Sequence, residues 1–249
     1  MAKPSYVFTT LDNPNESTIF TSTFAEGINN IGEVVGYYYG DGTAGNWLGF
    51  TYQYEKYSTQ NIPSSYQTFA QGVNVRGQVV GWYNENNVDY AYIYHNGTYT
   101  TLQPLSTLYN FAEGINAKGD IVGYYQSGAS GGGLISHGFL HIGPDTGGYY
   151  LTIDDPLANY PTNSNGTANG TVAKGTNSAG AIDGYYWDAQ GLAHGFLDQH
   201  GAYATIDDPL GVGGTFLTGI NDEGTIVGYY EDSVNVDHGF VYSHGESQL

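Results

Sequence analysis

The fifteen residues FAEGINNIGEVVGYY, at positions 24–38, recur almost unchanged as FAEGINAKGDIVGYY at positions 111–125. Shorter copies of the opening stand at 69–74 (FAQGVN), 172–177 (VAKGTN) and 216–221 (FLTGIN). The glycines of the five copies fall at 27, 72, 114, 175 and 219, giving spacings of 45, 42, 61 and 44 residues. Periods in the forties that contain several short strands are typical of propeller blades.

Every copy continues on one plan. A first strand runs into an N-x-x-G turn, where Asn can bond the turn backbone and Gly can take a positive φ. A second strand ends in GYY or a close variant, a third begins HGF or a variant, and a fourth ends in a proline corner. This predicts an all-β, five-bladed β-propeller with four antiparallel strands per blade. The expected single domain, 1–249, divides into blades at 20–63, 65–104, 107–156, 168–209 and 212–245.

The two ends of the chain complement each other. The last unit stops after its third strand, in HGFVYSHG at 238–245, whereas SYVFTTLDNP at 5–14 matches the fourth strand AYATIDDP at 202–209. We therefore expect 5–14 to pair beside Phe240, complete blade five and close the ring, because an open propeller leaves strand edges unpaired. Extra residues in the third unit form Gly-, Ser- and Asn-rich loops at 127–134, 141–148 and 159–170.

The amino-acid composition excludes several classes of binding partner. A formal charge of −19 repels nucleic acid and anionic membrane surfaces. The absence of Cys excludes disulfides, Cys-ligated zinc and thiol catalysis. There is no run of about 18 apolar residues, so the chain is not expected to insert into a membrane. Glycans, other small neutral ligands, cations and peptides remain, and we expect a monomer without a required cofactor.

The combination of GINxxGxIVGYY and HGF resembles the probable extracellular HAF-repeat family of bacteria, named for a His-Ala-Phe triplet. Here the triplet reads HGF at 137–139, 194–196 and 238–240, LGF at 48–50 and YAY at 90–92. The resemblance covers almost the entire chain and implies an exported, extracellular, propeller-like protein. The family carries no defining catalytic residue set, so the resemblance implies no activity.

Three repeated histidines are candidate ligand-binding residues. His137, His194 and His238 could contact a ligand together with nearby carboxylates, namely Asp188 and Asp232, because neutral imidazole hydrogen-bonds sugar hydroxyls. The alternative is architectural: each His bridges strands and fixes blade packing, as repeated residues in repeated folds commonly do. We favour that alternative.

The residue before each motif glycine changes character from copy to copy: Glu26, Gln71, Glu113, Lys174 and Thr218. First strands lie innermost in propellers, so Glu26 and Glu113 are candidate ligand-binding residues at the channel mouth. In blade four, Asp183 replaces the Val of the other blades, and we expect it directly across from Lys174. The pair is either a compensated ion pair or a catalytic site with perturbed pKa values.

The corners TIDDP and TLDNP gather carboxylates at strand ends. Their aspartates are weak candidates for Ca²⁺, because no D-x-D-x-D-G loop is present: Asp154, Asp155, Asp207 and Asp208. The alternative, which we favour, is that they accept backbone N–H bonds in turns.

No sequence motif of known catalytic mechanism is present. The leading hypothesis is a secreted ligand-binding propeller, lectin-like and specific for carbohydrate. The second is an enzyme, a lyase or hydrolase, with one asymmetric site near blade four that uses Lys174 and Asp183. The third is an exported structural repeat protein. We favour a protein without catalytic activity.

Overall fold

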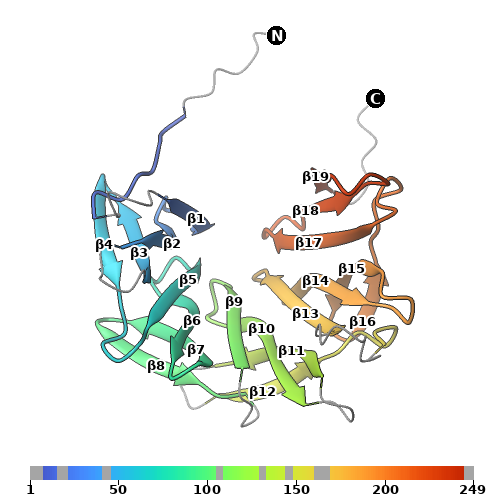
Figure 1. Ribbon diagram of the computed structural model, residues 1–249, viewed down its shortest axis with the longest axis horizontal. Helices are drawn as coiled ribbons and strands as arrows, with labels where there is room; N and C mark the ends of the chain where they lie inside the picture. The colour runs from blue at the N-terminus through green and yellow to red at the C-terminus, as the bar shows by residue number, and fades with distance from the viewer. Residues whose placement is uncertain are drawn as a thin grey trace.

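The computed structural model describes residues 8–15, 22–40, 46–104, 109–128, 133–143, 148–159 and 169–243, and its regular elements are all β-strands. Five groups of consecutive strands, which we call blades one to five in chain order, are arranged around a common centre (Figure 1). No helix of the described residues is long and apolar enough to cross a membrane. The expected all-β fold is confirmed.

The strands of blade one are β1 (Thr23–Ile28), β2 (Val34–Tyr39), β3 (Trp47–Gln53) and β4 (Lys56–Gln60). Blade two has β5 (Gln67–Val73), β6 (Val79–Glu85), β7 (Val88–His95) and β8 (Thr98–Leu102). Blade three has β9 (Tyr109–Ile115), β10 (Ile121–Gly128), β11 (Leu134–Ile142) and β12 (Tyr149–Ile153). Blade four has β13 (Asn169–Thr176), β14 (Ala181–Trp187), β15 (Ala193–Gln199) and β16 (Ala202–Thr205). Blade five has β17 (Gly214–Ile220), β18 (Ile226–Glu231) and β19 (Asp237–Tyr242).

Within each blade, consecutive strands pair antiparallel. Short parallel bridges from β7 to β9 and from β11 to β13 join blades two, three and four into one sheet. The first strands β1, β5, β9, β13 and β17 face the centre, and the blades form an arc that is open between β1 and β17 (Figure 1).

A β-bulge interrupts the first strand of every blade at the same place. In blade one Ala25 pairs with Gly36 and Gly27 pairs with Val35, which leaves Glu26 as the extra residue. The same shift occurs in the other four blades, at Gln71, Glu113, Lys174 and Thr218. A bulge changes the direction of one side chain without ending the strand. The variable position of the repeat is therefore the extra residue of the bulge, which has no direct partner on the second strand.

The turn asparagines link neighbouring blades. The Asn29 side chain accepts hydrogen bonds from Ile31 N and Glu33 N of its own turn, as the sequence suggested. Its amide also donates to the backbone oxygen of Asn74 in the next blade, at 2.9 Å. The bond repeats from Asn74 to Asn116, from Asn116 to Asn177 and from Asn177 to Asn221, at 3.0–3.1 Å. Four equivalent bonds therefore connect all five blades.

An apolar contact lies beside each of these bonds. Val35 of blade one packs with Ala70 of blade two, and Val80 with Ala112 and Val122 with Ala173 repeat the arrangement. All six residues are fully buried. The motif glycine permits the close approach of neighbouring blades: a Cβ added to Gly114 would stand 2.7 Å from the backbone oxygen of Lys174 in the next blade. Larger residues would force the blades apart.

The expected closure by the N-terminal strand is not present in the structure. The described residues 8–15 form no strand, Phe8 is 93% exposed, and the described part of blade five has three strands. Residues 5–7 of the expected strand lie outside the described part of the chain. The reason is the opening of the arc: Asn13 N donates to Thr23 Oγ1 at 3.1 Å and keeps the segment beside blade one, while β19 lies on the other side of the opening (Figure 1).

Asn116→Ala should lower the free energy of unfolding by about 2–3 kcal/mol, because it removes buried bonds to its own turn and to Asn177. Urea denaturation measures the change. Gln190→Ala, at an exposed turn position, is the control and should leave stability within about 0.5 kcal/mol of the wild type. Equal stability of the two variants would mean that the asparagine bonds do not hold the blades.

Candidate functional site

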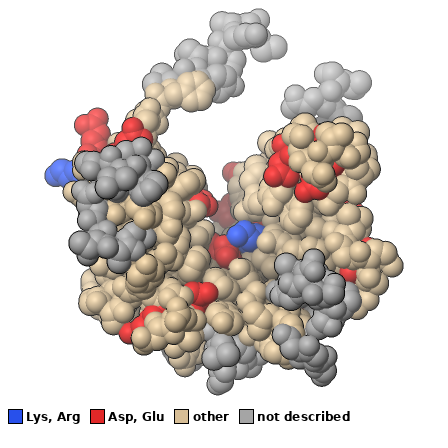
Figure 2. Space-filling view, viewed as in Figure 1, with Lys and Arg blue, Asp and Glu red and all other residues tan. Residues whose placement is uncertain are grey.

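The polar residues that precede the motif glycines lie on the inner face of the arc. The Lys174 ammonium donates to Glu113 Oε2 at 2.5 Å, so it joins blade four to blade three. Side-chain exposure is 25% for Lys174 and 8% for Glu113. Figure 2 shows the hollow between the ends of the arc, with a basic side chain beside acidic ones at its centre.

Charge and burial set the ionisation of this group. Burial by itself would lower the pKa of Lys174, but the Glu113 carboxylate outweighs it and raises that pKa above its usual value. Glu26 is exposed over part of its surface, but the inner face partly buries its carboxyl group and raises its pKa, although a hydrogen bond from Tyr37 and the charge of Lys174 oppose the change. The centre therefore holds a protonated amine among carboxyl groups from two other blades.

The expected cross-strand pair of Lys174 and Asp183 is wrong. Because the bulge shifts the register, Asp183 pairs with Gly175 instead, and Lys174 turns to Glu113. Asp183 is fully buried, and neither of its carboxylate oxygens accepts a hydrogen bond of ordinary geometry from the described residues, although backbone amides lie near them. Burial raises the pKa of Asp183 to about 7, while the charge of Lys174 and the amides of Gly175 and Gly219 moderate the rise.

A belt of aromatic rings lies next to the bulge residues. In blade one Phe24 stacks on Tyr37, with ring centroids 5.1 Å apart, and Tyr37 meets Phe69 of blade two edge-on at 4.9 Å. Phe69 stacks on Trp82 at 4.0 Å. Phe111 contacts Trp82 and stacks on Tyr124, and Phe216 contacts Tyr185 and stacks on Tyr229, whereas blade four has Val172 in place of the phenylalanine. The first aromatic residue after the glycine of each second strand thus lines the same side of the arc.

A cavity of about 330 Å³ occupies the end of the inner face where the N-x-x-G turns meet. Its walls are the turns of blades one, two, three and five, together with the residue that precedes the turn asparagine in each of the five blades: Ile28, Val73, Ile115, Thr176 and Ile220. The volume lies within the range that small-molecule sites span.

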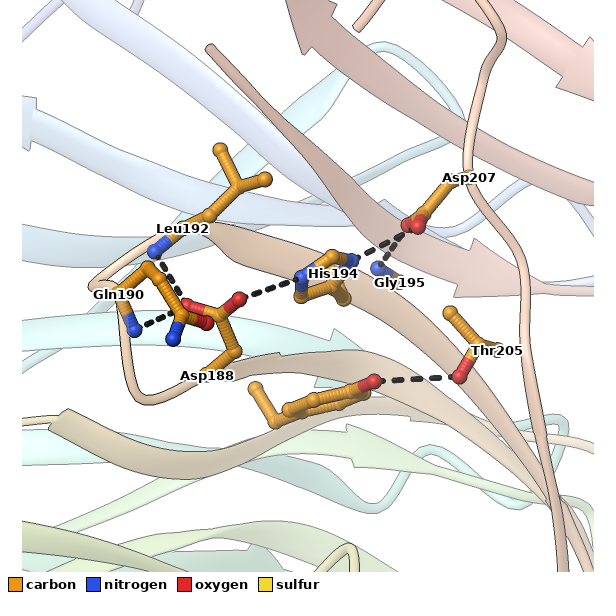
Figure 3. A network of polar contacts seen from close by, with 8 residues as sticks. Asp188, Gln190, Leu192, His194, Gly195, Thr205 and Asp207 are labelled. Carbon is orange, nitrogen blue, oxygen red and sulfur yellow. Dashed lines mark hydrogen bonds and ion pairs between the residues drawn. The ribbon is translucent and has the colours of Figure 1, made fainter. Parts of the chain in front are cut away.

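The second group of candidates surrounds His194 (Figure 3). Its Nδ1 is 2.7 Å from Asp207 Oδ2, and its Nε2 is 3.3 Å from Asp188 Oδ2. Asp188 also accepts from Leu192 N, so the histidine joins the β14–β15 turn to the end of β16. Burial would lower the pKa of His194, but the two carboxylates outweigh it and raise the pKa. Both ring nitrogens already have partners, as the architectural alternative expects.

The other two histidines follow this arrangement in part. His137 Nδ1 is 2.8 Å from Asp154 Oδ2, and its Nε2 is 3.1 Å from Ser127 Oγ. His238 Nε2 is 3.0 Å from Asp232 Oδ2, and this bond lowers the pKa of Asp232. In each blade the imidazole stacks on the second tyrosine of GYY, at 5.0–5.3 Å. The three sites lie on separate blades and do not converge.

The aspartates proposed for Ca²⁺ have other partners. Asp154 and Asp207 bind the histidines, whereas Asp155 and Asp208 accept from the backbone N–H groups of Leu157 and Leu210. Within the described ranges no three His, Cys, Asp or Glu side chains are grouped to hold a metal ion.

Sequence reasoning missed two features of the site. The bond from each turn asparagine to the next blade was not predicted, because the pattern N-x-x-G is fully explained by the turn itself. The partnership of Lys174 with Glu113 was missed because it spans 61 residues and depends on the bulge. The available signal was that both residues occupy the position before the motif glycine.

No protein-family model matches the chain, and neither does any curated protein. Among solved structures, a triple arginine-to-alanine mutant of AofleA from Arthrobotrys oligospora is similar, at 15% identity and a TM-score of 0.54, over 96% of this chain and 74% of that one. A lectin from Aleuria aurantia, a six-bladed β-propeller that recognises fucose, is similar at 14% identity and a TM-score of 0.48, over 90% and 74%. At 15% identity, the likeness to AofleA bears on the fold alone, and it agrees with the all-β architecture of this chain.

Lys174→Met should lower the free energy of unfolding by about 3 kcal/mol, because it leaves Glu113 as a nearly buried carboxylate without its cation. Adding Glu113→Gln should restore more than half of the loss, since the stranded charge is then removed. A double-mutant cycle from urea denaturation measures the coupling. Additive losses would show that the two residues do not act as a pair.

Asp183→Val should raise the free energy of unfolding at pH 8 by about 2–4 kcal/mol. A carboxyl whose pKa is raised on folding destabilises progressively as pH rises from about 4 through 7, and the variant should lose this pH dependence. Val occupies the equivalent site in the other blades and packs there over the motif glycine. Val122→Asp is the matched control and should be destabilised at pH 8; a less stable Asp183→Val would contradict the argument.

Proposed function

We propose that this chain is a carbohydrate-binding, lectin-like module built as a five-bladed β-propeller, exported from the cell and belonging to the HAF-repeat family. The observation that carries the proposed binding function is the inner face of the arc. There the repeat places planar polar side chains and a belt of aromatic rings on one concave surface.

This combination suits sugars. Carboxylates, amides and an ammonium group hydrogen-bond hydroxyls, and aromatic rings pack against the apolar C–H faces of a pyranose. Glu26, Gln71 and Lys174 supply three different chemistries at equivalent positions of three blades. The net charge of −19 favours neutral over acidic sugars.

The inner face is favoured over the histidine sites. A ligand at His194 or His137 would have to displace carboxylate or hydroxyl partners from ring nitrogens that are already bonded. The bulge residues Glu26 and Gln71 are exposed and half-buried, respectively, so they can meet a ligand without such a loss. Because the blades share one inner face, we expect one sugar-binding site on each chain.

The contacts favour binding over catalysis. A general base at neutral pH must lose its proton readily, whereas the pKa of Lys174 is raised by Glu113. Asp183, the other residue of the catalytic hypothesis, is fully buried and faces the next blade. Neither is placed as an acid–base pair acting on a shared substrate would require.

A panel of neutral glycans that includes L-fucosides, followed by calorimetric titration of each glycan bound, tests the function. We expect one sugar per chain, with Gln71→Ala and Glu26→Gln weakening binding by about tenfold or more, the loss of one good contact. We expect these losses because the Gln71 and Glu26 side chains lie on the inner face, where the sugar is proposed to bind.

Tyr54→Ala, at an exposed residue outside the inner face, is the matched control and should bind as the wild type does. A stoichiometry of about three that is lost on changing the histidines would move the site to His137, His194 and His238. If no glycan of the panel bound to the protein, the proposed function would be overturned.

A further inference from the structure

The two ends of the arc carry opposite halves of the contact that joins the blades elsewhere. At the end of blade five, the Asn221 side chain is exposed, and its amide has no acceptor in a following blade among the described residues. At the beginning of blade one, the Asn29 backbone oxygen accepts from Gly32 of its own turn, and no asparagine side chain of the described residues donates to it. One end thus offers the donor and the other the acceptor.

The apolar part of the contact is divided in the same way. Val227 of blade five is 45% exposed, whereas its equivalents Val35, Val80 and Val122 are fully buried. Ala25 of blade one is exposed, whereas Ala70, Ala112 and Ala173, its equivalents, are fully buried. Each exposed residue corresponds to one member of the Val–Ala pairs that join the other blades.

The outer edge of blade five also lacks partners that the other blades have. In blade four, Tyr186 is bonded to Thr205 of β16 and His194 Nδ1 to Asp207 just beyond it. Among the described residues, Tyr230 has no such threonine, and His238 bonds a carboxylate through Nε2 alone. Val241, on the unpaired edge of β19, is 71% exposed.

The N-terminal segment already occupies the corner that follows a fourth strand. Asp155 N and Asp208 N donate to threonines near the start of the first strand of the next blade, Thr171 and Thr215, at 2.9 and 3.1 Å. Asn13 N makes the same bond to Thr23 at 3.1 Å. The residues just before Asn13 therefore correspond to the end of a fourth strand, with Thr10 in the place of Thr205 and Asp12 in the place of Asp207.

We propose that blade five and blade one of the same chain dock on each other, and that residues 8–12 pair with β19 as its fourth strand. The interface repeats the other four: Asn221 donates to Asn29 O, and Val227 covers Ala25. On the outer edge, His238 Nδ1 meets Asp12. This inference rests on the five-bladed form proposed above, but it does not depend on what the inner face binds.

The register of the new strand follows from the existing ones. Phe196 pairs with Thr205 and Leu197 with Ala204 in blade four, and blade three repeats this with Phe139 and Leu140. The equivalent pairs are Phe240 with Thr10 and Val241 with Thr9. Directly opposed residues of antiparallel strands lie within the Cα separation that a disulfide spans.

The Thr9→Cys/Val241→Cys variant tests the docking, because the protein has no cysteine of its own. Under mild oxidation we expect a disulfide within one chain, seen as a monomer of altered mobility on non-reducing gels and by mass spectrometry. Leu197→Cys/Ala204→Cys, across β15 and β16, is the matched control for a pair already formed. Each single-cysteine variant controls for random cross-linking.

Disulfide-linked dimers or larger species would overturn the proposal in favour of a second copy on the free edge. Reduced monomer, while the control pair oxidises, would overturn it in favour of an open arc. A second measurement avoids reliance on the cysteines: Asp12→Asn and His238→Gln should be energetically coupled to the same extent as Asp207→Asn and His194→Gln. Absence of coupling for the first pair would contradict the docking, whatever the glycan assays show.

Discussion

The hydrogen bond from each turn asparagine to the backbone of the next turn is the contact on which the rest of the structure depends. The side-chain oxygen of Asn116, for example, holds its own turn while its amide reaches Asn177 of the following blade. One residue thus fixes both the local turn and the distance between blades. Because the bond is buried and repeated, it determines where each first strand lies relative to the centre, and with it the shape of the inner face.

The bulge lies on the first strands, whose positions these asparagine bonds determine. It releases one side chain per blade from the requirements of packing, so Glu26, Gln71, Glu113, Lys174 and Thr218 can differ while the residues around them stay small or apolar. A repeat that is uniform in its scaffold and variable at one inward position can present a mixed recognition surface. The aromatic belt beside it varies less: an aromatic residue follows the second-strand glycine in every blade, and the first-strand phenylalanine is replaced only in blade four, by Val172.

Blade four departs from the plan in two ways that have different causes. Lys174 is satisfied by Glu113 of blade three and contributes to the centre of the inner face. Asp183 replaces an interblade valine and is fully buried without a hydrogen bond of ordinary geometry among the described residues, so it destabilises the contact between blades four and five. The histidines belong to a third part of the molecule, where His194 ties the β14–β15 turn to the end of β16.

The sequence by itself determined the all-β class, the positions of the repeats, the turns and the order of strands, because each depends on short-range patterns such as N-x-x-G and GYY. It also pointed to the variable position before the motif glycine. Only the tertiary structure decided that Lys174 meets Glu113 rather than Asp183, because a one-residue bulge changes the register and brings together groups 61 residues apart. The role of Asn116 toward Asn177 was likewise decided between blades, where no local pattern records a partner.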